Sequence, residues 1–347
     1  MTPDQTAAAV IAGRKPTEDA MLAYWQATDR GLRTKAETVA VLAALSAAPS
    51  DDTMMRSFVR YIRDTYPPVA LPAAREAVNI VGTGGGPSTF NISTTSAFVV
   101  AAAGGKVLKS GSSAYSSSVG SGDILNALGL ARSASDDFTD AMLAETGLAF
   151  ASPQRYAPIC KRLAIAAMPL NFKVIGRFVN GLGPLICPYQ MRAHVIGVST
   201  PRLFEQIHSI AKTLGIPSLL VHSKLGVDEF LSIGPNRWLW AAELQANHLD
   251  PVDMGLERSC LNDLQGGDLD TNIEIMTAVL KGQGNRACTE TVALNAGVAL
   301  YAGGVASDLR TGTRLALDCL KSGAPFDKLE QAQAFARSEV KKLERVA

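Results

Sequence analysis

The segment VGTGGGPSTFNIST, residues 81–94, constrains the fold of this chain most strongly, because four of its first six residues are glycines. It follows a β-type run at 78–82 and leads into a helical pattern, ISTTSAFVVAAAGG, that ends at Gly104 and Gly105. A bare loop between a strand and a helix can lie flush against a ligand, and the free amides and dipole of the helix start favour phosphate. The segment therefore predicts an anion-binding loop, with a simple tight turn as the alternative.

The following segment, KVLKSGSSAYSSSVGSGD at 106–123, adds a cation and hydroxyl groups to this prediction. A β-type run delivers Lys109, seven serines follow between 110 and 121, and Asp123 is placed to cap the next helix. Lysine supplies a point charge and serine supplies directional donors, which together suit a pyrophosphate. A flexible linker is the alternative, and the strand and helix that flank the loop tightly weaken it. The glycine spacing fits neither GxGxxG nor GxxxxGK[ST], so a dinucleotide-binding fold and a nucleoside triphosphatase are disfavoured.

Hydrophobic periodicity divides the chain into two regions. Residues 1–72 show apolar residues at helical spacing, opened by cap-type residues such as Thr17 and Asp51, and three prolines fall within residues 67–72. Beyond them, short β-type runs alternate with helical patterns, which is typical of a mostly parallel sheet with crossover helices. The strands are expected at 78–82, 106–109, 194–198 and 218–223, with a hairpin formed by FLSIG (230–234) and RWLWAAEL (237–244).

We therefore expect an α/β protein: a small N-terminal helical domain, residues 1–72, joined by part of 170–190, and a larger α/β domain, residues 73–347, with a mostly parallel central sheet flanked by helices. Composition limits the partners. The chain has 347 residues, is 47% hydrophobic, and carries 33 basic against 32 acidic residues, so its formal charge of +1 offers no global field for nucleic acid or an anionic membrane. Five scattered cysteines fit a reducing cytoplasm, and no apolar run reaches the roughly 20 residues of a membrane span.

Several motifs together resemble one enzyme family. GTGG and TFNIST are followed, in order, by Lys109 with its Gly/Ser loop, NGLGPLICP (180–188), VIGVSTP (195–201), GVDEF (226–230) and LNAGVALYAGG (294–304). This order is similar to that of the anthranilate phosphoribosyltransferases and their relatives in glycosyltransferase family 3. The resemblance implies transfer of phosphoribose from phosphoribosyl pyrophosphate to an aromatic amine or related nitrogen acceptor, with release of pyrophosphate. It also implies Mg²⁺ and a homodimer built through the helical part.

Carried over position by position, the resemblance assigns a site in three parts, without a covalent nucleophile. The donor would be bound by Gly82, Gly84, Gly85, Thr89, Asn91, Ser93, Thr94, Lys109, Ser117 and Ser121. The metal would be held by Ser93, Asp228 and Glu229, because hard carboxylate oxygens bind magnesium that neutralises a departing pyrophosphate. The acceptor would be contacted by Gly82, Ser110, Ser112 and Leu170. Read in isolation, an adjacent acidic pair is more often solvated surface.

The chain departs from the family pattern on the acceptor side. The family's Lys-His-Gly-Asn-Arg becomes Lys109 to Ser113, KSGSS, and an acid is missing from the glycine loop. An ungapped alignment puts Leu170 where the family carries the arginine that meets the anthranilate carboxylate, while Lys173 and Arg177 nearby are interpreted as solvated charges. We therefore expect anthranilate to be a poor acceptor. His194 and His222 are interpreted as packed core residues rather than bases.

Three classes of function stay open at this point. The first is a phosphoribosyltransferase, acting on anthranilate or on another aromatic or heterocyclic acceptor. The second is a non-catalytic paralogue that keeps the fold to bind a ligand or nucleic acid. The third is an enzyme like the pyrimidine nucleoside phosphorylases, which the nature of the sugar donor would distinguish.

Overall fold

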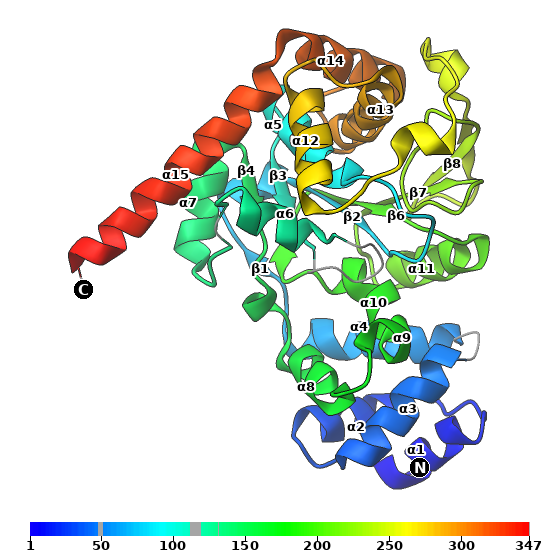
Figure 1. Ribbon diagram of the computed structural model, residues 1–347. Coiled ribbons are helices and arrows are strands. Elements are labelled where there is room, and N and C mark those ends of the chain that lie inside the picture. The colour runs from blue at the N-terminus through cyan, green and yellow to red at the C-terminus, as the bar shows by residue number, and fades with distance from the viewer. Residues whose placement is uncertain (48–50, 112–118, 131, 347) are drawn as a thin grey trace.

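The computed structural model describes residues 1–47, 51–111, 119–130 and 132–346. Figure 1 shows a bundle of helices that contains the N-terminus and a larger half built on a β-sheet, from which the C-terminal helix extends. The chain passes into the larger half through the proline-rich segment 67–72. No helix in these described ranges combines the length and apolar character that a membrane span requires.

The helical half combines four N-terminal helices with three later ones. These are α1 (Pro3–Ile11), α2 (Glu18–Asp29), α3 (Lys35–Ala47), α4 (Asp52–Thr65), α8 (Pro158–Ala167), α9 (Phe172–Ile175) and α10 (Arg177–Leu182). The side chains of Thr17 and Asp51 accept hydrogen bonds from the first turns of α2 and α4, which confirms them as caps. Because α8, α9 and α10 all pack against α3, a later part of the chain completes this half. The formal domain boundary at residue 72 stays a prediction.

The larger half is organised by one sheet. Within the described residues seven strands pair in the order β4-β3-β2-β6-β7-β8-β9, and β1 (Val69–Ala70) pairs separately with β5 (Tyr189–Gln190). The seven are β2 (Val78–Gly82), β3 (Val107–Lys109), β4 (Leu148–Phe150), β6 (Ala193–Gly197), β7 (Ser218–Ser223), β8 (Asn236–Trp240) and β9 (Asn247–Leu249). The run from β4 to β7 is parallel and the last two strands are antiparallel, so the mostly parallel sheet is confirmed.

The strand order reverses between β2 and β6. The chain steps outward from β2 to β3 and β4 and later resumes on the other side of β2 with β6 and β7. In open parallel sheets a ligand site forms at such a reversal, at the carboxyl ends of the strands. The carboxyl end of β2 is Gly82, where the glycine loop begins.

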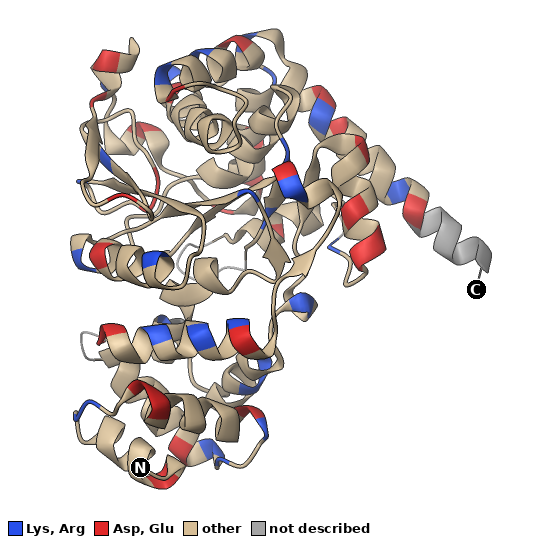
Figure 2. Ribbon diagram, turned by 180° about the vertical axis from the view of Figure 1, so that it is seen from behind, with Lys and Arg blue, Asp and Glu red and all other residues tan. Residues whose placement is uncertain are grey.

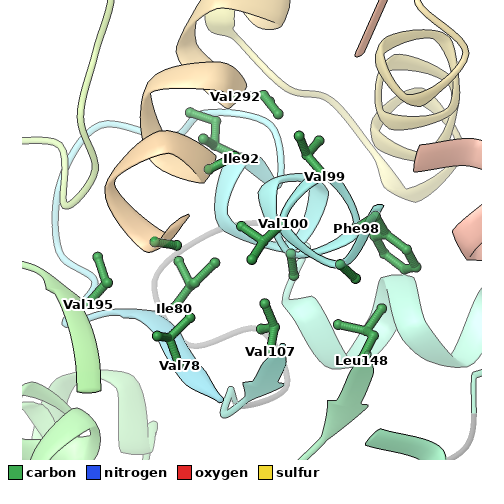
Figure 3. Close-up of a cluster of buried hydrophobic side chains, with 14 of the residues drawn as sticks. Val78, Ile80, Ile92, Phe98, Val99, Val100, Val107, Leu148, Val195 and Val292 are labelled. Atoms are coloured by element: carbon green, nitrogen blue, oxygen red, sulfur yellow. The ribbon is translucent and has the colours of Figure 1, made fainter. Parts of the chain in front are cut away.

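One face of the sheet is covered by α5 (Ile92–Ala102), which packs on β2, β3 and β4 and beneath α13. Figure 3 shows Val78, Ile80 and Val107 of the sheet beneath Val99 and Val100 of α5. Because the helix is enclosed by strands on one side and helices on the others, its second half, residues 97–101, is apolar and buried, while residues 93–96 place hydroxyl groups in its first turns. The remaining helices are α6 (Ser121–Ala127), α7 (Asp136–Thr146), α11 (Pro201–Thr213), α12 (Leu269–Leu280), α13 (Arg286–Ala302), α14 (Leu309–Ser322) and α15 (Ala324–Val346), with short 3-10 turns at Ala73–Glu76, Pro153–Arg155, Gly183–Ile186, Pro251–Met254 and Leu261–Leu264.

The other face of the sheet belongs to a second hydrophobic core. Side chains alternate along a strand, so Val195 and Leu219 join the core beneath α5 while Ile196 and Leu220 join the opposite one. The second core continues through α11 into the helical half, where the fully buried Trp25 lies among aromatic rings. The two halves are therefore joined by continuous apolar packing.

The structure corrects some of the expected elements. FLSIG (230–234) forms no strand, and β8 pairs instead with β7 and β9, so the predicted hairpin is wrong. Asn236 explains this, since its side chain accepts from the Leu231 amide at 2.9 Å and donates to the carbonyls of Leu231 and Gly234. These bonds close residues 231–236 into a turn. Asp123 caps the start of α6 as expected, but from the third helical position, where it accepts a hydrogen bond from the amide of the N-cap residue Gly120 at 2.9 Å.

Candidate active site

A cavity of about 820 Å³ lies at the carboxyl end of β2, where the glycine loop, α5 and the helical half meet. One wall comes from the α/β half and is formed by the loop before α5, the residues after β3 and the acidic pair Asp228 and Glu229. The opposite wall comes from residues 153–164 and 172–186, which belong mainly to α8, α10 and the turns beside them. The cavity therefore lies between the two halves of the molecule.

The glycines of this region make room for the loop that carries the acidic pair. A Cβ atom on Gly82 would lie 1.9 Å from Oδ2 of Asp228, and one on Gly197 would lie 1.6 Å from the Asp228 carbonyl oxygen. Gly84 adopts a φ of +72°, which L-residues with side chains rarely adopt. The bare backbone at the ends of β2 and β6 thus serves close packing of chain on chain as well as access to a ligand.

The acidic pair is fixed by amides from the glycine loop and from α5. Asp228 Oδ2 accepts a hydrogen bond from the Gly84 amide at 2.7 Å. Glu229 Oε1 accepts one from the Ser93 amide at 3.0 Å, and Oε2 lies 3.4 Å from the Thr89 hydroxyl. Burial raises the pKa of Asp228, and burial together with the neighbouring Asp228 charge raises the pKa of Glu229 to about 8. Both carboxyl groups therefore lie where a cation would favour their ionised forms.

Lys109 lies beneath the first turn of α5. Its side chain is buried, and Nζ donates to the carbonyl oxygen of Ile80 at 2.7 Å and to Ser93 Oγ at 3.2 Å. Burial lowers the pKa of Lys109 to about 8, while Glu229 and Asp228 act in the opposite direction. The lysine thus places a positive charge directly behind the helix start and orients the Ser93 hydroxyl.

The first turn of α5 presents further polar groups to the cavity. Asn91 is the N-cap residue of α5, yet its side chain makes no capping bond. Its Nδ2 lies 3.4 Å from the Val119 carbonyl oxygen, and its buried Oδ1 has no hydrogen-bond partner among the residues that the structure describes. Thr94, almost fully buried, also lines the cavity. An unpaired buried acceptor beside a helix start is a position that a ligand or a bound cation would satisfy.

The residues predicted to bind the donor largely converge on this cavity. Gly82, Gly84, Thr89, Asn91, Ser93, Thr94, Lys109 and Ser121 line it together with Asp228 and Glu229, whereas Gly85 lies in the same loop but is not among the lining residues. Ser117 and Ser112 lie outside the described residues. The donor and metal roles of the converging residues stay predictions.

The acceptor residues are brought together less well. Gly82 and Ser110 line the cavity, and the Ser110 hydroxyl accepts a hydrogen bond from Asn79 at 2.7 Å. Leu170 does not line the cavity. It follows the end of α8 by three residues and is 51% exposed to solvent. The assignment of Leu170 to the acceptor site is therefore corrected. The ungapped alignment placed it there without regard to the turn after α8.

Sequence reasoning missed the wall that the helical half contributes. Lys161 of α8 and Asn180 of α10 line the cavity, together with Tyr156 and Gln154 from the segment before α8. The motif NGLGPL marked Asn180 as a family position, but nothing local in the sequence marks Lys161, since an exposed helix lysine is a common feature. The two histidines are buried as expected, with His222 Nδ1 2.7 Å from the Val198 carbonyl oxygen.

Comparison with known proteins identifies the family. The model of the glycosyl transferase family, a/b domain, matches residues 74–326. An anthranilate phosphoribosyltransferase of Thermomicrobium roseum is 35% identical over 343 residues, which cover 95% of this chain and 97% of that protein. The chain belongs to this glycosyl transferase family.

Solved structures of family members agree with the fold of this glycosyl transferase. The crystal structure of anthranilate phosphoribosyltransferase from Thermus thermophilus superimposes with a TM-score of 0.83, at 32% identity, over 96% of this chain and 99% of that one. The enzyme from Saccharomyces cerevisiae, solved in complex with PRPP and Mg, gives a TM-score of 0.75 at 22% identity over 92% of each chain. The α/β architecture with an added helical half is therefore that of the family.

Proposed function

We propose that this protein transfers phosphoribose from phosphoribosyl pyrophosphate to an aromatic amine and releases pyrophosphate. Its relatives of known sequence and structure carry the name anthranilate phosphoribosyltransferase. The observation that carries the proposal is the convergence of Lys109, Ser93 and Glu229 at the start of α5, inside a cavity whose other wall is largely apolar. A polar wall for the sugar phosphate thus faces an apolar wall for the acceptor ring.

The residues present fit a magnesium ion. Among the described residues no three His, Cys, Asp or Glu side chains gather around one point, so the chain offers no complete protein cage. Magnesium is commonly held by one or two carboxylates together with substrate phosphates, which is what Asp228 and Glu229 with the Ser93 hydroxyl would provide. Bound there, the ion would supply positive charge to the departing pyrophosphate.

The chain's own groups perform two tasks in this reaction. Displacement at the anomeric carbon develops positive charge on the sugar and negative charge on the leaving group. The start of α5, the glycine-loop amides and the Lys109 charge stabilise the leaving group, while the opposite wall holds the acceptor nitrogen against the sugar carbon. An aromatic amine is unprotonated at neutral pH, so no side chain has to remove a proton before attack.

The proposal is tested by calorimetric titration of phosphoribosyl pyrophosphate with and without Mg²⁺, followed by a panel of aromatic amines with release of pyrophosphate as the readout. We expect magnesium-dependent donor binding and turnover of at least one amine. Donor binding without turnover would favour a non-catalytic paralogue, and consumption of a pyrimidine nucleoside with phosphate would favour a phosphorylase. The proposal also includes a homodimer formed through the helical half and a cytoplasmic location, which sedimentation and cell fractionation would test.

Nucleic-acid binding is not part of this proposal. Figure 2 shows lysine and arginine interspersed with aspartate and glutamate on the helices of both halves. The near-balance of 33 basic and 32 acidic residues leaves little net field to attract a polyanion. A filter-binding assay with single- and double-stranded probes at physiological salt should therefore detect no tight complex.

A further inference from the structure

The wall of the cavity that faces the phosphate-binding groups is mostly apolar. It is formed by Ala157, Ala164, Phe172, Val179 and Ile186, which together suit the face of an aromatic ring. Tyr156 lies in this wall, and burial raises the pKa of its hydroxyl, which keeps the side chain neutral. A planar apolar substrate with few polar groups therefore fits this side of the cavity.

One cation interrupts this apolar wall. Lys161 lines the cavity from α8, and its side chain is exposed. Within the part of the chain that the structure describes, no hydrogen bond or ion pair holds its ammonium group. The other lysine of the cavity, Lys109, is already engaged by Ile80 and Ser93. Among the cavity-lining lysines whose side chains the structure describes, Lys161 is thus the one that is free to take up an anionic group of a ligand.

We propose that Lys161 determines acceptor specificity by binding the carboxylate of an aromatic amine that carries one. The inference rests on the proposed transferase function and deepens it by naming the acceptor class. It reverses the expectation, drawn from Leu170 and the serines after Lys109, that a carboxylate would find no cationic partner. Lys161, contributed by α8, would supply the positive charge that Leu170 and the serines after Lys109 lack.

Two further features of this wall favour an anion beside Lys161. The N-cap residue of α8 is Ala157, which offers no side-chain acceptor, and Ala157 and Pro158 line the cavity, so the positive end of the α8 dipole faces it. Asn180 of α10 lines the same cavity and can donate through its amide. Arg177 is exposed and does not line the cavity, so it offers no competing cation.

The direct test is binding of an unreactive probe. Benzoate, which has the carboxylate but no amine, is titrated calorimetrically into the protein saturated with phosphoribosyl pyrophosphate and Mg²⁺, with neutral benzamide as the reference. Lys161→Met keeps the length of the side chain and removes its charge, and it should weaken benzoate binding about ten- to hundredfold while changing benzamide binding by less than about twofold. Lys161→Arg should keep most of the benzoate affinity.

Kinetics supply the second readout. In Lys161→Met the KM for anthranilate should rise about ten- to hundredfold at saturating donor, with the KM for phosphoribosyl pyrophosphate unchanged. Arg177→Met, which removes a nearby cation outside the cavity, should leave both values unchanged. Equal benzoate affinity in wild type and Lys161→Met, or no benzoate binding to the wild type, would overturn the inference. Loss of benzoate binding in the variant without turnover of any amine by the wild type would support the inference and refute the transferase proposal.

Discussion

Asp228 Oδ2 lies 2.7 Å from the backbone amide of Gly84 and occupies the space that a side chain at Gly82 would need. The acidic loop and the glycine loop therefore fit together as one unit. The position of the Asp228 carboxylate, for which we propose a role in magnesium binding, therefore depends on the absence of a side chain at Gly82, 146 residues earlier in the chain.

Gly82→Ala should displace this carboxylate. Its new Cβ would lie 1.9 Å from Asp228 Oδ2, so the acidic loop must shift by an ångström or more, and a misplacement of about 1 Å costs about a hundredfold in turnover. Magnesium-dependent donor binding and turnover measure the effect. Gly234→Ala is the matched control, because a Cβ there meets no atom within 4 Å. Wild-type behaviour of Gly82→Ala would contradict the proposed role of the Asp228 position.

Lys109→Met should weaken donor binding. The variant keeps an unbranched apolar stem but removes the charge behind the start of α5, at a cost of about 1.5–3 kcal/mol, which is about ten- to hundredfold in affinity for phosphoribosyl pyrophosphate. Titration calorimetry in the presence of Mg²⁺ measures this loss. Lys106→Met, which removes a surface lysine paired with Glu76, serves as the control. An unchanged affinity in Lys109→Met would show that Lys109 does not contribute to donor binding.

Neutralising the acidic pair should abolish the dependence of donor binding on magnesium. In the double variant Asp228→Asn with Glu229→Gln, the amides cannot replace two anionic oxygen ligands, so Mg²⁺ should no longer raise the donor affinity. Donor titrations across a range of Mg²⁺ concentrations test this expectation. Asp253→Asn, at an exposed acid outside the cavity, should retain the full dependence. Equal magnesium stimulation in the double variant would show that Asp228 and Glu229 do not bind magnesium.

His194 should make the fold sensitive to acid. It is almost fully buried, and its Nδ1 lies 3.4 Å from Asn79 Nδ2, which is a donor, so Nδ1 acts as the acceptor. Burial lowers the pKa of His194 from 6.5 to about 4, with a smaller contribution from Arg63. The unfolded chain therefore binds one more proton than the folded chain between these values, and stability is lost as the pH falls from about 6.5 towards 4.

The slope of this loss should reach about 1.4 kcal/mol per pH unit for one proton. His194→Gln removes the titrating group, so urea unfolding of this variant at pH 7, 6 and 5 should show a shallower decline of the free energy of unfolding. The exposed His248, changed to Gln, is the reference. Identical pH slopes in wild type and His194→Gln would show that other groups dominate the acid response.

The glycine loop and the start of α5 could be predicted from sequence because their signals are local. Gly82 ends a strand, glycines follow, and Asn91 precedes an apolar helix. The hairpin at 230–244 was wrong because Asn236, a residue within the segment, closes a turn through its side chain, which periodicity does not detect. The short strands β4 and β9 have only three residues each, too few for an alternating pattern to stand out.

The cavity wall formed by α8 and α10 could not be predicted for a different reason. Lys161 and Asn180 reach the cavity only because α8 and α10 fold back onto α3 and face the glycine loop from the other half. No spacing in the sequence encodes that approach. Lys109 was found from sequence, but its burial beneath Ser93, and therefore its action through the hydroxyl and the helix start, depends on the packing of α5 on the sheet.

The two walls of the cavity are built by separate stretches of chain, one rooted in the sheet and the other in α8 and α10. Under the proposed function, substitutions in α8 and α10 would therefore alter the preferred nucleophile while the backbone proposed to bind the sugar phosphate stays unchanged. Such a division lets descendants of one gene acquire new acceptors by few mutational steps, since the reactive half of the chemistry is inherited intact. Under the proposed function, the serines after Lys109 and Lys161 on α8 are the positions of this chain where the choice of acceptor would be set.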